Sequence, residues 1–363
     1  MLHNMPDFFQ SALAFLVVLG VLVFFHELGH YLAARWRRVH VEVFSIGFGP
    51  AVATWRDRVG TVWKLAWLPL GGYVKLHGQE RPDTRLPEAA KRIAGRVFHE
   101  KPVGSRALVV AAGPIANFVL AMVLFALLFA TAGRPIILPI AGDVVENSAA
   151  ARAGIQVNDR ILSISGTPIR TFEDVQRIIS AHPDEILPIA IKRGDEEKIL
   201  SVRTEEHDAA DGRKLGMLGI RGGRAEYERL SLPEALVGGV TQTWQVTSET
   251  VIGLWQMVSG QRGTEDLGGP LRIAQLSGQV AQLGLGSLIS FIAVLSVNLG
   301  LINLFPIPVL DGGHLLFYLA EAVRGRPLPA RAQEYGFRAG LALLAGLFIL
   351  ATWNDLGHLG LFH

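Results

Sequence analysis

The chain has no cysteine and few charged side chains for its 363 residues. Without cysteine it can form no disulfide bond, thiolate metal site, iron–sulfur cluster or cysteine nucleophile, so a bound metal needs His, Asp or Glu ligands. Charged residues make up 18% of the chain, against about 25% in soluble proteins, and the mean hydropathy is +0.34. The net charge of +2 is only weakly clustered, so nucleic acid is not an expected partner. This composition predicts a membrane protein.

Four apolar stretches have roughly the 20 residues that a helix needs to cross a bilayer. They predict membrane helices at about 8–28, 107–132, 283–310 and 336–354, the last being the shortest. The first stretch has neither a basic start nor a small-residue cleavage site, so we expect it to be retained as a span. The lipid bilayer is therefore an expected partner.

The distribution of Lys and Arg predicts the orientation. Residues 26–106 carry fourteen of them and residues 311–338, read as a loop, carry four, whereas the segments outside the first and last spans carry none. The positive-inside rule places both basic segments in the cytoplasm. Both termini and the segment between spans two and three are then expected on the opposite side.

Residues 133–228 are predicted to form a compact α+β domain inserted between two membrane halves, 1–132 and 283–363. Hydrophobic periodicity and turn residues give its elements. Residues 229–282 are predicted to be an amphipathic or interfacial helical linker, because Glu249 and many polar residues disfavour a fifth span. Within the inserted domain we expect strands at 140–145, 159–166, 186–192 and 198–203 and helices at 148–154 and 171–181.

Residues 40–80 are predicted to form a small β structure at the cytoplasmic face of the membrane. Residues 61–68 have strand-like composition. Irregular backbone is tolerated at membrane depth only against protein or a water-filled cavity, so we expect this region to lie against one of them. Turns are expected at the glycines and prolines Gly47, Gly49, Pro50, Pro69, Gly71 and Gly72.

The first span leads directly into His26-Glu-Leu-Gly-His30. Positions four apart share one face of a helix, so His26 and His30 can bind one zinc ion together. Glu27 is near enough to act as general base toward a water on that ion. An Asp, Lys or Arg at a helix centre costs about 2.5–3.5 kcal/mol in a membrane, so titratable groups beside an apolar run need a compensating partner such as a metal.

Two histidines leave a tetrahedral site one protein ligand short, and Asp311 is the candidate third ligand. Pro306 and Pro308 break the third span just before it. Water or substrate then takes the fourth position, and Asn303 can hydrogen-bond the substrate backbone. Asp311 has the alternative role of a helix cap, and His314 is a spare ligand or an outer residue of the site.

The motif at 26–30, paired with residues 303–312, resembles the site-2 protease family of intramembrane zinc metalloproteases. Residues 113–118, Gly-Pro-Ile-Ala-Asn-Phe, also match a family pattern, and the insert resembles a PDZ domain. The whole is similar to the bacterial regulator-of-sigma-E protease branch. The resemblance implies one zinc per chain in the inner membrane, with the active site near the cytoplasmic side and the insert and termini in the periplasm. It also implies cleavage of membrane-protein helices already trimmed by another protease, typically in anti-sigma factors or signal-peptide remnants.

The same resemblance gives the remaining site candidates. Asn303, Pro306, Gly71 and Gly72 are expected to bind substrate. The PDZ-like order is circularly permuted, so Leu218-Gly219-Ile220 is the loop expected to meet a peptide carboxylate. Such domains also act as spacers or steric filters, and only one fits here where studied members of the branch carry two.

Two other functions stay open on the sequence alone. Intramembrane His and Asp also line ion paths, as in a divalent-metal transporter, but no inverted pair of broken segments supports that function. An inactive receptor would use the PDZ-like domain for tethering, which the intact ligand set and Glu27 disfavour.

Overall fold

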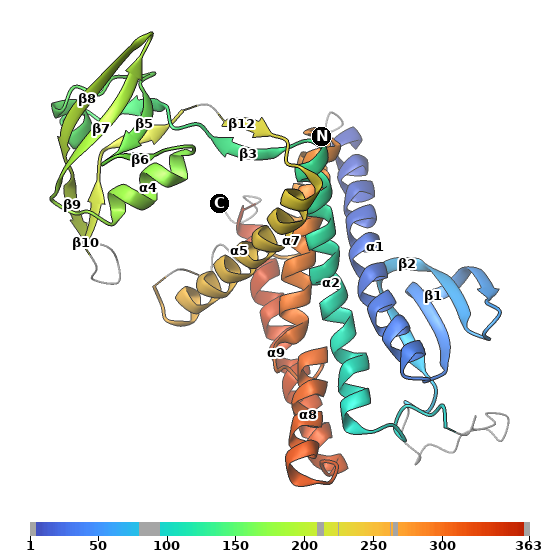
Figure 1. Cartoon of the computed structure of the whole chain (residues 1–363). Helices are drawn as coiled ribbons and strands as arrows, with labels where there is room; N and C mark the ends of the chain where they lie inside the picture. Colours follow the sequence, from blue (N-terminus) through green and yellow to red (C-terminus); the bar gives the residue numbers. More distant parts are fainter. Residues whose placement is uncertain are drawn as a thin grey trace. The chain divides into compact units, whose positions relative to one another are not determined.

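A computed structural model describes residues 5–79, 95–208, 214–223, 225–261, 263 and 268–358. Parts of the predicted regions lie outside these residues: 1–4 and 80–94 of the first membrane half, 209–213 and 224 of the inserted domain, 262 and 264–267 of the linker, and 359–363 of the second membrane half. The chain divides into two compact units. The membrane unit comprises residues 1–128 and 232–363, and the inserted unit comprises residues 129–231 (Figure 1).

Four described helices of the membrane unit are long and apolar enough to cross a membrane, which confirms the four predicted spans. Three of them begin before their predicted bounds, and the first and fourth also end beyond them, because a helix can continue past the apolar stretch that crosses the lipid. The third ends at Leu304, well before the predicted 310, since Pro306 and Pro308 cannot continue it. The helices are α1 (Met5–Trp36), α2 (Val103–Thr131), α7 (Leu285–Leu304) and α9 (Ala330–His358).

The loop predicted at 311–338 is wrong, because most of it is helical. Helix α8 (Asp311–Arg324) follows α7 and ends at Gly325, which has a left-handed φ of 69°. Helix α8 is mostly apolar, with Asp311, Glu321 and Arg324 as its charged residues, whereas the basic residues of the segment and its place between two spans suggested a loop. Helix α9 then begins at Ala330.

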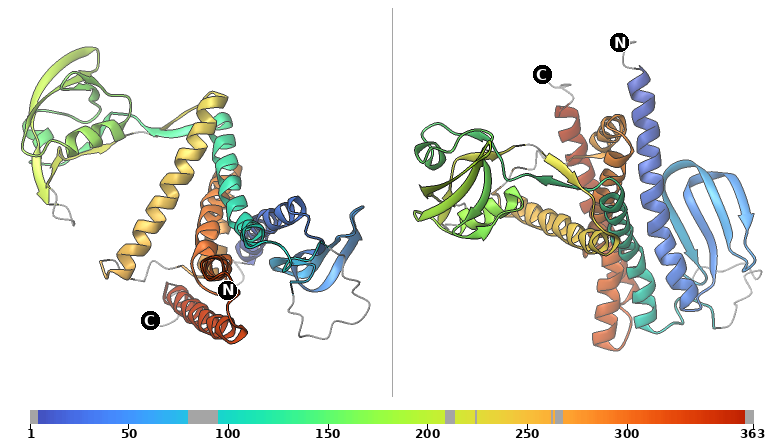
Figure 2. Two further views of the ribbon diagram at one scale, coloured as in Figure 1. Left: turned by 60° about the horizontal axis from the view of Figure 1, so that its bottom comes forward. Right: turned by 45° about the horizontal axis from the view of Figure 1, so that its top comes forward.

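Two further helices, α5 (Leu232–Val258) and α6 (Pro270–Gln282), occupy the region predicted as a helical linker. Helix α6 packs against α1, where a Cβ on Gly278 would lie 1.9 Å from Ser11 Oγ. The buried carboxylate of Asp355 in α9 accepts three backbone N–H bonds at the start of α6, from Gly269, Leu271 and Arg272. The helices of the membrane unit can be followed in Figure 2.

The predicted β structure is present as two long, irregular strands, β1 (Val41–Arg56) and β2 (Val62–Leu76). Residues 41–48 lie between two parts of β2, 72–76 on one side and 62–68 on the other, and residues 51–56 pair with 62–66. Several expected turns therefore lie inside strands. Gly47, Gly49 and Gly71 have positive φ where the chain changes its partner.

Asp57, between β1 and β2, fastens this sheet to α1. Its carboxylate accepts hydrogen bonds from the amides of Val59 and Thr61, the indole of Trp63 and the hydroxyl of Tyr31 in α1. Burial raises the pKa of Asp57, but these hydrogen bonds outweigh burial and lower it to about 2. The sheet is thereby held beside the part of α1 that carries the two histidines.

The inserted unit contains every element that the sequence predicted for it. Four strands form a sheet in the order β6-β5-β7-β8. Its described residues include two helices, and the second begins with a capping box between Thr171 and Asp174. These elements are β4 (Ala141–Val144), α3 (Ala149–Arg152), β5 (Arg160–Ile164), β6 (Thr167–Pro168), α4 (Phe172–Ser180), β7 (Ile186–Arg193) and β8 (Glu196–Arg203).

Three short strand pairs complete the inserted unit, and most of their strands were not predicted because they are too short for alternation to be visible. They pair β3 (Arg134–Ile137) with β12 (Ala225–Glu228), β4 with β11 (Ile220–Gly222), and β9 (Glu205–Asp208) with β10 (Lys214–Met217).

Candidate zinc centre

His26 and His30 lie one turn apart on α1 where this helix touches α2. Glycine makes the contact possible, because a Cβ on Gly29 would lie 2.2 Å from the carbonyl oxygen of Ala112 in α2. On α2, a Cβ on Gly113 would lie 2.3 Å from Nε2 of His30. The imidazole of His30 therefore occupies space that only glycine leaves free.

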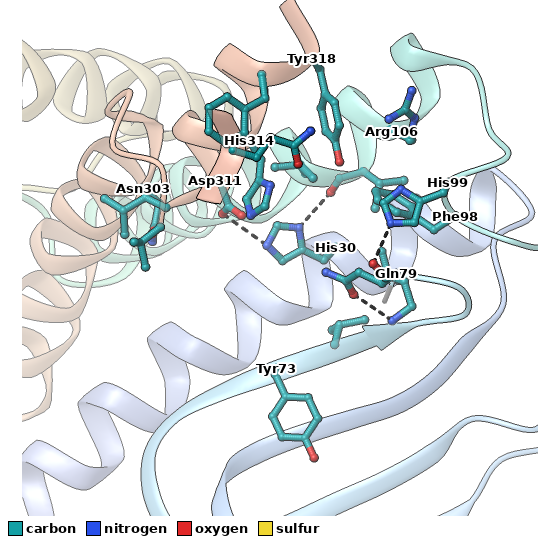
Figure 3. Close-up of a pocket in the computed structure, with 18 of the residues that line it drawn as sticks. His30, Tyr73, Gln79, Phe98, His99, Arg106, Asn303, Asp311, His314 and Tyr318 are labelled. Atoms are coloured by element: carbon teal, nitrogen blue, oxygen red, sulfur yellow. Dashed lines mark hydrogen bonds and ion pairs between the residues drawn. The ribbon is translucent and has the colours of Figure 1, made fainter. Parts of the chain in front are cut away.

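Asp311 is brought to the histidines by the tight connection between α7 and α8. A Cβ on Gly312 would lie 2.2 Å from the carbonyl oxygen of Leu304, and a Cβ on Gly313 would lie 2.3 Å from that of Ile307. The two glycines after Asp311 thus let the first turn of α8 pack directly on the end of α7. The carboxylate of Asp311 then points toward α1, as Figure 3 shows for His30.

The three side chains converge on one point. Nε2 of His26 lies 3.2 Å from Nε2 of His30 and 3.2 Å from Oδ2 of Asp311, and Nε2 of His30 lies 3.4 Å from the same oxygen. Ligands of a tetrahedral zinc ion with bonds near 2.0–2.1 Å lie about 3.3 Å apart. Oδ2 of Asp311 is buried and has no hydrogen-bond partner among the described residues. The donor set fits a zinc ion in both spacing and chemistry.

The outer nitrogen of each imidazole faces α2. Nδ1 of His30 lies 2.9 Å from the carbonyl oxygen of Val109. A carbonyl can only accept, so Nδ1 carries the proton and Nε2 keeps the lone pair that a metal needs. Nδ1 of His26 lies 3.2 Å from the side-chain amide of Asn117.

A cavity of about 780 Å³ opens beside the three ligands. Three residues proposed from the sequence, Glu27, Asn303 and Gly72, line it together with Tyr73 and Val74 of β2. Asn303 and Tyr73 are labelled in Figure 3. The backbone N–H of Val74 faces the carboxylate of Glu27. This strand can approach because residue 72 is glycine, whose Cβ would lie 3.1 Å from Cγ of Glu27.

The sequence profile of peptidase family M50 matches residues 14–347. The chain belongs to peptidase family M50. A predicted zinc metalloprotease of Agrobacterium fabrum is 44% identical over 363 residues, covering 95% of each chain. Metalloprotease MmpA of Caulobacter vibrioides is 38% identical over 99% of this chain and 98% of its own. Zinc metalloprotease RasP of Geobacillus kaustophilus is 31% identical over 97% of this chain and 99% of its own.

Family membership, these relatives and the four apolar helices identify the M50 protease as an intramembrane zinc metalloprotease. The resemblance to the site-2 protease family is thereby confirmed. The transporter and the inactive receptor, open on the sequence alone, lose their support because the family and its named relatives are peptidases.

Two predicted substrate-binding residues of the M50 protease stand apart from its cavity. Neither Pro306 nor Gly71 lines the cavity in the described part of the chain. Gly71 has a φ of 112°, and its Cβ would lie 2.6 Å from the ring of Phe48. Pro306 belongs to the connection that ends α7.

Sequence reasoning missed the cavity wall that lies away from the ligands. Arg106 of α2 forms a buried ion pair with Glu321 of α8, with Nη2 to Oε1 at 2.6 Å, and its guanidinium lies 4.9 Å from the ring centre of Tyr318. All three residues line the cavity. Arg106 and Glu321 are 215 residues apart, so no local pattern could have paired them. His314, one turn after Asp311, also lines the cavity.

The predicted peptide loop, Leu218-Gly219-Ile220, belongs to the inserted unit and connects β10 with β11. The amides of Val145 and Ala150 donate to the carbonyls of Gly219 and Leu218. Gly219 has a φ of 74°, which explains glycine at this turn.

Proposed function

We propose that the M50 protease cleaves peptide bonds within the transmembrane helices of other membrane proteins, with zinc bound by His26, His30 and Asp311 and with Glu27 as general base. The observation that carries this proposal is the convergence of three ligand atoms, 3.2–3.4 Å apart, at a cavity that Glu27 also lines.

Bound zinc would supply a Lewis acid and would lower the pKa of water to about 7. Glu27 takes a proton from the attacking water on its carboxylate and delivers it to the nitrogen of the departing peptide. The N–H of Val74 orients that carboxylate, and the carbonyl of Val109 keeps His30 in the tautomer with a free Nε2. Each residue therefore has a role that its contacts support.

The substrate would bind along residues 72–76 of β2. Among the described residues this segment pairs only with 41–46, and Gly72, Tyr73, Val74 and Leu76 line the cavity. A helix hides its carbonyls in internal hydrogen bonds, so the substrate must unwind, and pairing with a strand edge replaces those bonds with little demand on sequence. Asn303, across the cavity, would bind the substrate backbone. Pro306 and Gly71 would act on substrate binding by shaping the adjoining turns.

For the inserted unit we propose a PDZ-like domain on the periplasmic side of a bacterial inner membrane. Its strand β11 pairs with β4, and a Cβ on Gly222 of β11 would lie 3.2 Å from Phe172 of α4, so the strand and the helix are neighbours. The basic segments 26–106 and 311–338 support a cytoplasmic position for the zinc centre. The domain would bind a C-terminus at Leu218-Gly219-Ile220 or exclude bulky substrates. The substrates would be proteins trimmed beforehand by another protease, such as anti-sigma factors or signal-peptide remnants.

Glu27→Gln tests the catalytic proposal. We expect cleavage of a reporter with one membrane helix to fall about 10²–10⁴-fold, because a general base contributes about that much, while zinc content stays at one per chain. Glu249→Gln, on the exposed part of α5, makes the same chemical change and serves as control. Unchanged turnover by the Glu27 variant, or wild-type protein without zinc, would contradict the proposal.

Deleting residues 135–225 tests the inserted unit. If the unit excludes bulky substrates, the shortened protease should cleave a reporter that still carries its outer domain. If cleavage still requires prior trimming, the filter is refuted, and a titration of the wild type with C-terminal peptides then tests the binding role.

A further inference from the structure

Helix α2 presents three positions, two turns in total, to the two histidines of α1. Val109, Gly113 and Asn117 are spaced four residues apart and so lie on one face. Val109 offers its carbonyl to His30, Gly113 leaves room for the His30 ring, and Asn117 places its side-chain amide 3.2 Å from Nδ1 of His26. The family pattern at 113–118 thus contains the residue that contacts the second imidazole.

The tautomer of His26 decides what Asn117 must do. A neutral imidazole has one N–H and one lone pair. Nε2 of His26 points at Nε2 of His30 and Oδ2 of Asp311, so this nitrogen must keep its lone pair to bind zinc. Nδ1 then carries the proton and needs an acceptor, as metal-binding histidines nearly always have.

Asn117 is the partner that the structure gives to Nδ1 of His26. The amide nitrogen Nδ2 now faces Nδ1, whereas Oδ1 is buried without a hydrogen-bond partner among the described residues. The two ends of an amide have almost the same shape, and which end faces a neighbour is decided by hydrogen-bond chemistry. A half-turn about the Cβ–Cγ bond brings Oδ1 to Nδ1 and supplies the required acceptor.

Helix α7 fixes the backbone from which this amide extends. Asn117 is fully buried. The carbonyl oxygen of Asn117 accepts a hydrogen bond of 2.8 Å from the hydroxyl of Ser296 in α7. Gly300, one turn further along α7, also lies close, because a Cβ built on it would be 3.3 Å from the Cβ of Asn117. Because Ser296 and Gly300 hold the backbone here, the side chain reaches His26 from a fixed origin.

We propose that Asn117 is a positioning residue that accepts a hydrogen bond from the Nδ1–H of His26 and so fixes the tautomer and ring orientation in which His26 binds zinc. This inference rests on the proposed zinc centre of His26, His30 and Asp311. Helix α2 would then supply the hydrogen-bond acceptor for both imidazoles: the main-chain oxygen of Val109 for His30 and the side-chain oxygen of Asn117 for His26.

Two substitutions in the full-length protease test the proposal, with zinc affinity measured by competition against a chromogenic chelator. Asn117→Leu keeps the approximate volume but offers no acceptor, so we expect zinc to bind about 10–100-fold more weakly, the usual effect of losing such a partner. Asn117→Asp offers only acceptors and should bind zinc within about threefold of the wild type, a margin well inside that effect.

Asn298→Leu on α7 is the matched control, because it makes the same change at an amide that contacts Thr250 of α5 and does not touch His26. It should leave zinc affinity unchanged, and the absorption spectrum of the cobalt-substituted protein should change only with Asn117→Leu. Wild-type affinity in Asn117→Leu would overturn the proposal. Loss of zinc in Asn117→Asp would also overturn the proposal, because the amide of Asn117 would then act as a donor. If Asn117→Leu does not fold, the result with Asn117→Asp decides alone. A wild type that binds no zinc would instead refute the proposed zinc centre.

Discussion

The inserted unit and the membrane unit differ in where they place apolar and polar side chains. In the inserted unit, Ile161, Ile164, Ile189 and Ile191 are fully buried in one core. The membrane unit buries the polar Asn117 and Ser296 completely. Many of its large apolar side chains are exposed, as on α9, where they include Leu341, Phe348, Ile349 and Trp353.

This difference shows that one chain folds in two solvents. In water, burial of apolar area is the main source of stability, so the core of the inserted unit reports on its stability. In lipid, apolar surface gains little from burial, and close packing at small residues with polar contacts holds the helices together. A buried polar group in the membrane unit therefore indicates either helix packing or the zinc centre.

The largest effect is expected for Asp311→Ala. Loss of a residue that hydrogen-bonds a metal ligand weakens metal binding by up to about 100-fold. Loss of the ligand Asp311 itself should therefore weaken zinc binding by more than this and should abolish proteolysis. Zinc stoichiometry and chelator competition measure this. The same variant should leave the urea unfolding midpoint of the inserted unit unchanged. A shifted midpoint would show that the stability of the inserted unit depends on the zinc centre.

A smaller effect, confined to the inserted unit, is expected for Asp159→Asn. The carboxylate of Asp159 is buried and accepts hydrogen bonds from Arg193 and the amide of Gln156. Its loss should lower the free energy of unfolding of the isolated unit by about 2 kcal/mol, since hydrogen bonds to charged groups contribute about 1.5–3 kcal/mol. Asp184→Asn makes the same change at a solvent-exposed pair with Arg203 and should have no measurable effect.

The same carboxylate gives this comparison a pH dependence. Burial raises the pKa of Asp159, but its bonds to Arg193 and Gln156 outweigh burial and lower the pKa below its usual range. A group with a lowered folded-state pKa stabilises the fold above its unfolded pKa of about 3.9 and loses this contribution as the pH falls. The difference between wild type and Asp159→Asn should thus be constant near pH 6 and shrink below about pH 4. A constant difference at every pH would rule out the carboxylate as its cause.

The smallest effect is expected for Gly113→Ala in the membrane unit. The added methyl group would meet Nε2 of His30 at 2.3 Å and force the ring away from its ligand position. Zinc should bind about tenfold more weakly, at the lower end for a disturbed ligand orientation. Gly104→Ala on the same helix has nothing within 4 Å of the new methyl group and is the control. Equal zinc affinity of the two variants would show that the ring tolerates displacement.

Local patterns in the sequence predicted much of both units. Apolar length predicted the spans, and hydrophobic periodicity predicted α4 to within a residue at each end. The pair His26 and His30 was recognisable because helix geometry fixes which residues share a face. Glu27 and Asp311 followed from the chemistry of a metal site, and all four residues line the cavity.

Features that depend on tertiary contact could not be predicted in the same way. Asn117 and His26 are 91 residues apart, and their contact requires the close approach of α1 and α2. Gly47 and Gly49 are residues typical of turns, yet here they lie within β1, at the point where it changes from one part of β2 to another. Helix α8 was missed because it is a short helix in the connection between two spans, and a sequence does not show which face of such a helix finds an apolar neighbour.

The four glycines around the zinc ligands, at positions 29, 113, 312 and 313, leave no room for even a methyl group. For protein engineering, this makes the scaffold of the metal site a fixed part that substitutions can only damage. An attempt to redirect the enzyme toward other cleavage sequences should therefore leave these positions alone and diversify other residues that line the cavity, such as Tyr73, Gln333 and Phe337.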